Sequence, residues 1–292
     1  MPLPLPLVHE QFLPPPPALR PAVRHLLLLT LAREAAPVVR TLLPDFQISL
    51  LINLGPAADL WLAYKAAVAP GQRLTSLLLV GPLTQPLHYR LPSGARVLVV
   101  GFTLAGFYRL FRVPAGQLRG AFTDPDALVP GGNFARLWQQ LQALVTPAQL
   151  VEAVAAFYRP YLYPAEQAQA ELLGQLPQLA KPGYLSPLKS LATTSRLSER
   201  TLQLRFQKYL GFSTKELLRF LRFRRVLTAV QQHVQTTGGA LDWLALLEQH
   251  GYYDQPHLIH DFTHFLGQSP RKAALELRTG TTICVATTEL LG

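Results

Sequence analysis

The chain has 292 residues, a formal net charge of +10 and a single cysteine, and 49% of its residues are hydrophobic. This length suffices for a sizeable core and suggests two domains. One cysteine, Cys284, excludes a disulfide framework within the chain, and the leucine-rich runs at 26–29 and 77–80 are too short to span a membrane. We therefore expect a cytoplasmic protein of two domains.

The first 22 residues are rich in proline and include four consecutive prolines at 14–17. Consecutive prolines favour an extended chain, because each ring fixes its own backbone angle. We predict an arm over residues 1–22, either an ordered lead-in on the domain surface or a motif that a partner recognises.

Apolar runs of strand length follow the arm. They lie at about 23–31, 46–54, 59–65, 74–80, 85–90 and 96–102. Turn-forming pairs such as Gly55-Pro56 and Gly81-Pro82 separate them. The pattern predicts an antiparallel sheet or half-barrel.

Helical spacing replaces the strand pattern after Phe102. Helices are expected near 107–111, after 114–116, and over 134–145, 147–159 and 164–174. Residues 23–175 are therefore predicted to form an α+β domain with helices flanking the sheet, followed by a linker at 176–184.

The α+β domain shows no pattern of a catalytic, cofactor or metal site. Its histidines, His9, His25 and His88, are far apart in sequence, and Gly131-Gly132-Asn133 lacks the lysine and spacing of a phosphate-binding loop. We expect no enzyme and no cofactor. A small-molecule enzyme built on the sheet remains a weaker alternative.

A helix-turn-helix pattern begins at Ser186-Pro187, which can cap a short helix. Ser198 can cap the next helix, in which Leu202, Phe206 and Leu210 repeat every four residues and mark a buried face. The opposite face carries four side chains that could meet base edges: Arg200, Gln203, Leu204 and Gln207.

The same pattern returns about 55 residues later. Gly251 permits a tight turn, Asp254 can cap a helix, and Leu258 and Phe262 mark its buried face. The opposite face presents Gln255, His257, His260 and His264.

A long helix is predicted over 214–234, between the two patterns. Gly211 can end the preceding helix, and Ser213 with Glu216 forms a capping box. Arginines on a helix are usually just solvated, but beside two reading helices they are candidate phosphate contacts. With the basic pair near the end of the domain, this set comprises Arg219, Arg222, Arg271 and Lys272.

Positive charge does not locate a nucleic-acid surface by itself. Residues 185–278 contain 13 Lys and Arg against 7 Asp and Glu, and residues 1–184 contain 14 against 9. Because the excess is shared by both parts, the motifs must locate the surface.

The motifs of residues 185–278 resemble those of the AraC/XylS transcription regulators. The matching residues are Ser198-x-Arg200-x-Leu202-x-x-x-Phe206, Gly211-x-Ser213, Gly251-Tyr252-x-Asp254-Gln255-x-His257-Leu258 and Gly267-x-Ser269-Pro270. The resemblance covers about a third of the chain and implies an all-α domain with two helix-turn-helix units on a linker helix. Arg196 stands at a turn where the family usually has glycine. Residues 279–292, after the resembling domain, are expected to form a tail.

Residues 23–175 are more loosely similar to the small-sheet sensor domains of such regulators. The similarity rests on Leu43-Pro44-Asp45, Leu51-Ile52-Asn53-Leu54-Gly55 and Val100-Gly101-Phe102. The two resemblances imply a transcription regulator that binds double-stranded DNA. Its further candidate partners are a small-molecule effector, RNA polymerase and a second copy of the chain.

In that family the two second helices enter successive segments of the major groove. By position, base reading then falls on Arg200, Gln203 and Leu204, and on Gln255, His257 and His260. Two other interpretations remain open. Leu204, Ile259 and Arg196 also suit a protein-interaction adaptor that reads DNA weakly, and the histidines at 257, 260 and 264 have a spacing compatible with metal binding.

Overall fold

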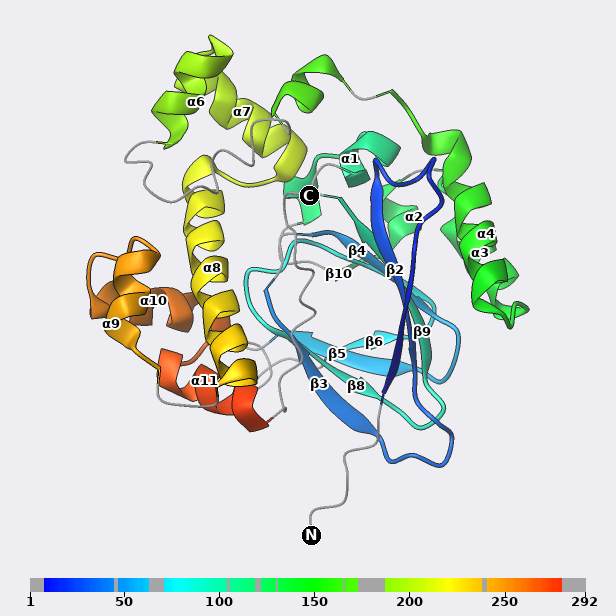
Figure 1. Ribbon diagram of the computed structural model, residues 1–292. Coiled ribbons are helices and arrows are strands. Elements are labelled where there is room, and N and C mark those ends of the chain that lie inside the picture. The colour runs from blue at the N-terminus through cyan, green and yellow to red at the C-terminus, as the bar shows by residue number, and fades with distance from the viewer. Residues whose placement is uncertain are drawn as a thin grey trace.

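The computed structural model describes residues 8–44, 47–62, 71–103, 106–118, 122–129, 131–164, 166–172, 187–237 and 241–279. Two antiparallel sheets with flanking helices form the first part of the molecule, and a group of helices around the long α8 forms the second (Figure 1). We call these parts the sheet domain and the helical domain. The predicted α+β class is confirmed.

Sheet A has six strands among the described residues. Their spatial order is β1 (His9–Leu13), β2 (Val23–Thr30), β9 (Arg96–Phe102), β4 (Ser49–Asn53), β7 (Leu77–Val80) and β10 (Phe122–Thr123). Sheet B has the order β3 (Val38–Leu42), β8 (Leu87–Leu91), β5 (Ala58–Leu62) and β6 (Gln72–Leu74). Every described strand pair is antiparallel, as predicted.

The inner strands of sheet A, β2, β9, β4 and β7, are buried on both faces, which explains why they are almost continuously apolar. Leu27 of β2 lies opposite Val99 of β9 and belongs to the core between the two sheets. Its neighbour Leu28 points the other way, into a core shared with the flanking helices. The sheet domain therefore has three layers, with sheet A in the middle.

The helical layer on sheet A contains α1 (Gly106–Phe111), η2 (Ala115–Leu118), α2 (Pro125–Leu128), α3 (Phe134–Gln142), α4 (Pro147–Tyr158) and η3 (Arg159–Tyr161). In Figure 1, α3 and α4 lie side by side on the side of sheet A away from sheet B. Residues 167–172 are also helical. The helices expected from periodicity are thus present, and α4 matches its predicted range to within one residue.

Three parts of the sheet domain differ from the prediction. Strand β1 lies inside the range assigned to an extended arm, where Leu19 and Ala22 are also buried. Strand β3 was missed, because its sequence is short and contains Arg40. The expected run at 74–80 is divided into the end of β6 and the whole of β7.

The helical domain consists of α6 (Pro187–Ser195), α7 (Glu199–Leu210), α8 (Thr214–Thr236), α9 (Trp243–Gln249), α10 (Gln255–Leu266) and α11 (Pro270–Thr279). α6 with α7, and α9 with α10, form the two predicted helix-turn-helix units. The predicted linker at 176–184, the Ser186 cap and residues 280–292 lie outside the described residues.

The predicted helix ends are confirmed. Ser198 and Asp254 accept backbone hydrogen bonds as N-caps, and Ser213 with Glu216 forms the capping box that starts α8. Gly211 and Gly251 have φ values of 78° and 70°, in the left-handed region that glycine adopts at little cost.

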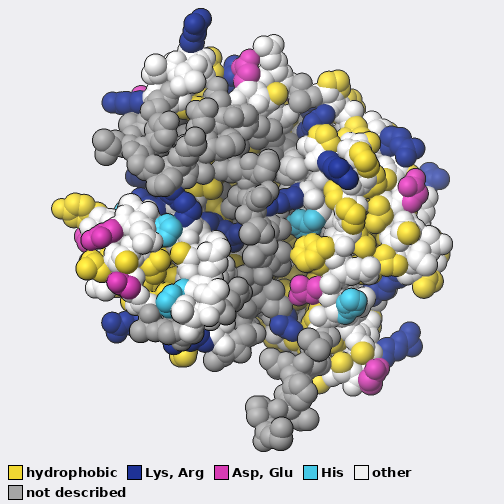
Figure 2. Space-filling model, viewed as in Figure 1, with side chains coloured by type: hydrophobic (Ala, Val, Ile, Leu, Met, Phe, Trp, Pro, Cys, Tyr) yellow, Lys and Arg dark blue, Asp and Glu magenta, His cyan; other side chains and the backbone are white. Residues whose placement is uncertain are grey.

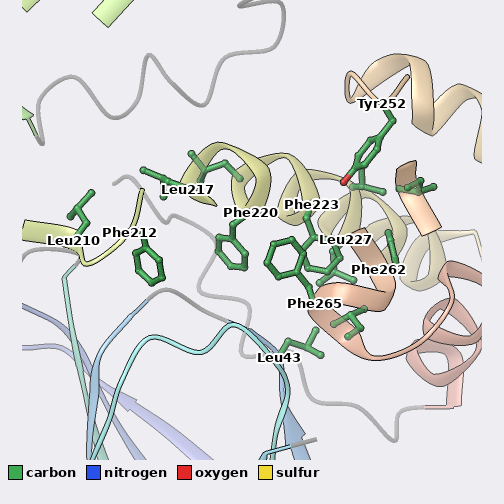
Figure 3. Close-up of a cluster of buried hydrophobic side chains, with 14 of the residues drawn as sticks. Leu43, Leu210, Phe212, Leu217, Phe220, Phe223, Leu227, Tyr252, Phe262 and Phe265 are labelled. Carbon is green, nitrogen blue, oxygen red and sulfur yellow. The ribbon is translucent and has the colours of Figure 1, made fainter. Parts of the chain in front are cut away.

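The core of the helical domain is built around α8 (Figure 3). Phe223 of α8 stacks on Phe265 of α10, with ring centroids 4.6 Å apart. Leu43, Tyr108 and Leu172, all from the sheet domain side of the chain, are buried in the same cluster. The helical domain therefore packs against the sheet domain. None of the described helices is both long and apolar enough to cross a membrane.

Candidate nucleic-acid interface

The exposed face of α7 carries the residues that the sequence predicted as base readers. Leu202, Phe206, Tyr209 and Leu210 are buried. The four predicted readers on the opposite side, Arg200, Gln203, Leu204 and Gln207, are all exposed. Leu204 is 57% exposed, so its side chain is available for contact with a partner.

The second candidate reading face, on α10, differs from the one predicted. Gln255 and His260 are exposed, but His257 is only partly so. Ile259 is 44% exposed and lies nearer the centre of the open face than His257 does. Thr263, one turn after Ile259, is also exposed and was not among the predicted readers. The helical angle of about 100° per residue would have placed it there.

The rings of His257 and His260 are held by arginines of α8. Arg222 Nη2 lies 2.8 Å from His257 Nε2, and Arg219 Nη2 lies 3.0 Å from His260 Nδ1. An arginine can only donate, so both ring nitrogens must be unprotonated acceptors. His257 then carries its proton on Nδ1 and His260 on Nε2, which leaves the Nε2–H of His260 as a donor.

Asp261 joins the same arginines from inside the domain. Its side chain is 0% exposed, and its two oxygens accept from Arg219 Nε at 2.6 Å and Arg222 Nη2 at 3.2 Å. Tyr252 donates its hydroxyl to Oδ2 at 2.9 Å. Burial, and then the negative charge of Asp261, raise the pKa of Tyr252, so this hydroxyl stays protonated and remains a donor. We call Asp261, Arg219, Arg222 and Tyr252 the Asp261 network.

The Asp261 network gives Arg219 and Arg222 a role that was not foreseen. Their side chains are only about a quarter exposed, at 25% and 24%, and they fix α10 on α8. One signal in the sequence pointed to this. Asp261 falls on the same helical side as Leu258 and Phe265, and an acid on a buried face requires a charged partner.

The other two predicted phosphate contacts, Arg271 and Lys272, lie exposed in the first turn of α11. Arg271 also lines a hollow of about 260 Å³ at the start of α10. Its lining comprises Trp243, Gln255, Leu258, Ile259, Ser269, Pro270 and Arg271. A basic side chain and Gln255 thus line the same hollow.

The turn between α6 and α7 is strained at Arg196. Its φ is 53°, a left-handed value that costs an L-residue roughly 1–2 kcal/mol. A glycine at this position would adopt the same φ at little cost.

The C-terminal end of α7 is fastened to the sheet domain by a cluster centred on Glu166. Its Oε1 accepts from Tyr108 at 2.9 Å and Arg112 at 3.0 Å, on the sheet-domain side. Its Oε2 accepts from Tyr209 at 2.7 Å and Lys208 at 3.1 Å, both on α7. The hydrogen bond from Tyr209, together with those from Tyr108 and Lys208, lowers the pKa of Glu166 to about 2. We call these five residues the Glu166 cluster.

A backbone contact lies beside the Glu166 cluster. Gly211, which ends α7, packs so closely on η2 that an added Cβ would lie 2.5 Å from the nitrogen of Gly116. An added Cβ on Gly116 would in turn meet the amide of Gln207 at 3.1 Å. One predicted reading residue therefore rests against the sheet domain.

Replacing Glu166 with glutamine should weaken this docking by about 1 kcal/mol, a modest value because the carboxylate is about a third exposed. The pKa of Glu166 is lowered from 4.5 to about 2, so its charge stabilises the fold fully above pH 4.5 and ceases to do so as the pH falls through 2. Urea unfolding of the wild type and Glu166→Gln from pH about 2 to neutral should show a difference that shrinks below pH 4.5. A difference independent of pH would contradict this, and Glu152→Gln, at a 74% exposed carboxylate, is the control.

Charge on the visible surface follows the sequence count. In Figure 2, Lys and Arg side chains are distributed over both domains and do not form one patch.

Across the described residues, no three His, Cys, Asp or Glu side chains are grouped so that they could hold a metal ion. The candidate interface is thus defined by two helix faces.

The sheet domain contains a second candidate site, a cavity of about 90 Å³ between sheets A and B. Leucines and valines make up most of its wall. The exceptions are Ala58 and five residues with polar groups, Glu10, His25, Gln47, Ser49 and Tyr89.

Comparison with known proteins gives the following similarities. A family model described as "Domain of unknown function (DUF6597)" matches residues 11–124, less than half of the chain. No curated protein matches. ToxT from Vibrio cholerae has a similar structure, with 9% identity over 86% of this chain and 97% of that one and a TM-score of 0.43. The AraC-like transcriptional activator CuxR has 15% identity, coverages of 76% and 81% and a TM-score of 0.28. At such low identities and TM-scores, the function has to be argued from the residues of this chain.

Proposed function

We propose that this protein is a sequence-specific, DNA-binding transcription regulator whose helical domain reads DNA under the control of the sheet domain. The observation that carries the proposal is the pair of exposed helix faces, on α7 and α10, held by one long helix. α8 has 23 residues and is therefore roughly 34 Å long, close to one turn of B-form DNA. A helix of that length can hold two readers at successive major grooves.

The two faces would divide the work of reading. Arg200 and Gln203 on α7 can donate to purine edges, and Leu204 can contact a thymine methyl group. On α10, Gln255 and the Nε2–H of His260 provide further donors. Arg271 and Lys272, with the remaining N–H groups of Arg219 and Arg222, would contact phosphates.

Control by the sheet domain is supported by its attachment to α7. The Glu166 cluster and the Gly211–Gly116 contact join the end of a reading helix to the sheet domain. A change in that contact alters the position of α7, so effector binding or self-association of the sheet domain could change DNA affinity. RNA polymerase and a second copy of the chain remain candidate partners within this proposal.

Arg200→Ala should reduce discrimination at one position of the binding site, by about 1–3 kcal/mol if the contact is bidentate to guanine. Selection of bound genomic fragments with the purified protein provides the site, and gel shifts with single-base variants measure the loss. Arg136→Ala, which removes an exposed charge from α3, is the matched control and should leave binding unchanged. Wild-type discrimination by Arg200→Ala would disprove the assignment of this residue.

An adaptor that binds another protein is the second candidate, because both faces also expose apolar side chains. Leu204 is 57% exposed, Ile259 44% and Tyr253 93%. Gel shifts at two salt concentrations separate the two functions. A regulator retains one specific complex in excess competitor DNA, whereas an adaptor shows only salt-sensitive, non-specific binding.

A further inference from the structure

The cavity between the two sheets has a polar part that the packing of the sheets does not use. In sheet A, His25 of β2, Gly101 of β9, Ser49 of β4 and Val80 of β7 lie opposite one another in register. Gly101 has no side chain, and an added Cβ would lie 2.5 Å from the His25 ring. The ring of His25 therefore lies directly on the sheet, and Gln47, two residues before Ser49, extends the same cavity wall.

Gln47 is the residue that requires explanation. It is only 5% exposed and lines the cavity, yet its Nε2 has no hydrogen-bond partner within the described part of the chain. The Nδ1 of His25 is also buried without a partner there. A buried donor without an acceptor is destabilising, so a cavity that keeps one is suited to a ligand that supplies an acceptor.

The charges around the cavity favour an uncharged ligand. Burial, and then Arg24, lower the pKa of His25 to about 4, so its ring is neutral at physiological pH. Tyr89 lies opposite Arg40 across β3 and β8. Burial, and then Glu10, raise the pKa of Tyr89, so its hydroxyl is also uncharged at physiological pH. Among the described residues that line the cavity, Glu10 is the ionised one, and it is partly exposed to solvent, so the buried part of the wall offers an ion no compensating charge.

The size of the cavity limits the ligand further. Its volume of about 90 Å³ is smaller than the cavity of about 150 Å³ that accepts benzene in another protein. The leucines and valines of the wall, Leu27, Leu29, Leu51, Leu60, Val97 and Val99 among them, suit a short hydrocarbon chain.

We propose that this cavity binds a small uncharged carbonyl compound, a ketone or primary amide of about five non-hydrogen atoms. Its oxygen accepts a hydrogen bond from Gln47 Nε2, and its carbon chain lies among the leucines and valines. The role of such a compound as the effector of the regulator rests on the proposed function. Its binding to the cavity is independent of the proposed function.

The test is an NMR titration of the full-length protein, without DNA, with butanone and with propanamide. The side-chain amide signal of Gln47 is identified as the one that disappears in Gln47→Met. Either compound should shift this signal saturably, and propanoate, of similar size but charged, should not. Gln47→Met should weaken binding at least tenfold while the unliganded protein unfolds at the same or a higher temperature, because an unpaired polar group has been removed.

Gln140→Met, at an exposed glutamine of α3, is the matched control and should bind like the wild type. The proposal is overturned if neither compound shifts the Gln47 signal, if propanoate binds as well as butanone, or if Gln47→Met binds with unchanged affinity. Binding of butanone without any effect on DNA affinity would sustain the site and reject only its role as the effector site. Failure to bind DNA would count against the proposed function and leave the cavity site intact.

Discussion

Asp261→Asn should lower the free energy of unfolding of the helical domain by about 3 kcal/mol, the low end of the cost of breaking a buried ion pair. The substitution keeps the shape of the side chain but leaves Arg219 and Arg222 without their anion. Those arginines are about a quarter exposed, so water recovers part of the loss. Thermal and urea unfolding measure the effect.

The control for Asp261→Asn is Glu248→Gln, which removes an exposed negative charge from α9 and should change stability little. A double-mutant cycle with Arg222→Met isolates the pair, since the two losses should be strongly non-additive. Additive losses, or an Asp261→Asn protein as stable as the wild type, would show that the network does not hold α10 on α8.

Gly211→Ala should also cost about 3 kcal/mol and should separate α7 from η2. Part of the cost, about 1 kcal/mol, comes from the φ of 78°, which alanine tolerates poorly. The rest comes from overlap, because the new Cβ would lie 2.5 Å from the nitrogen of Gly116 and 2.7 Å from the carbonyl carbon of Ala115. Backbone atoms cannot move aside as a flexible side chain can. Unfolding curves and hydrogen exchange of the η2 amides report the two effects.

The chain supplies its own control in Gly251→Ala. Gly251 has nearly the same φ, 70°, but no described atom lies within 4 Å of the added Cβ. Its alanine variant is therefore destabilised by backbone strain alone, and its free energy of unfolding should fall by about 1 kcal/mol. The η2 amides should be protected from hydrogen exchange as in the wild type. Equal losses in the two variants would mean that α7 does not press on the sheet domain.

The sequence predicts best those features whose signals lie within a few residues. The caps at Ser198 and Asp254 and the capping box at Ser213 were readable because each involves a side chain and a backbone group three residues away. The exposed face of α7 followed from the period of its leucines and Phe206 in the same way.

The features that were missed join distant parts of the chain. Arg219 and Asp261 are 42 residues apart, and Tyr209 and Glu166 are 43 apart, so no local pattern could pair them. The partial burial of His257 was missed for the same reason, because its ring turns toward Arg222, 35 residues earlier in the chain. Strand β3 was not predicted for a different reason. Arg40 interrupts its run of apolar residues, although tertiary packing still places the segment in a sheet.

The pairing of Arg219 and Arg222 with one buried carboxylate changes how their charge would be felt by a polyanion. A guanidinium that is already neutralised inside the protein displaces few of the cations condensed around a double helix. The formal charge of this domain therefore overstates the ionic part of its affinity for DNA. Most of the entropy of cation release would come from Arg271 and Lys272 at the start of α11, which form no ion pair with any described residue.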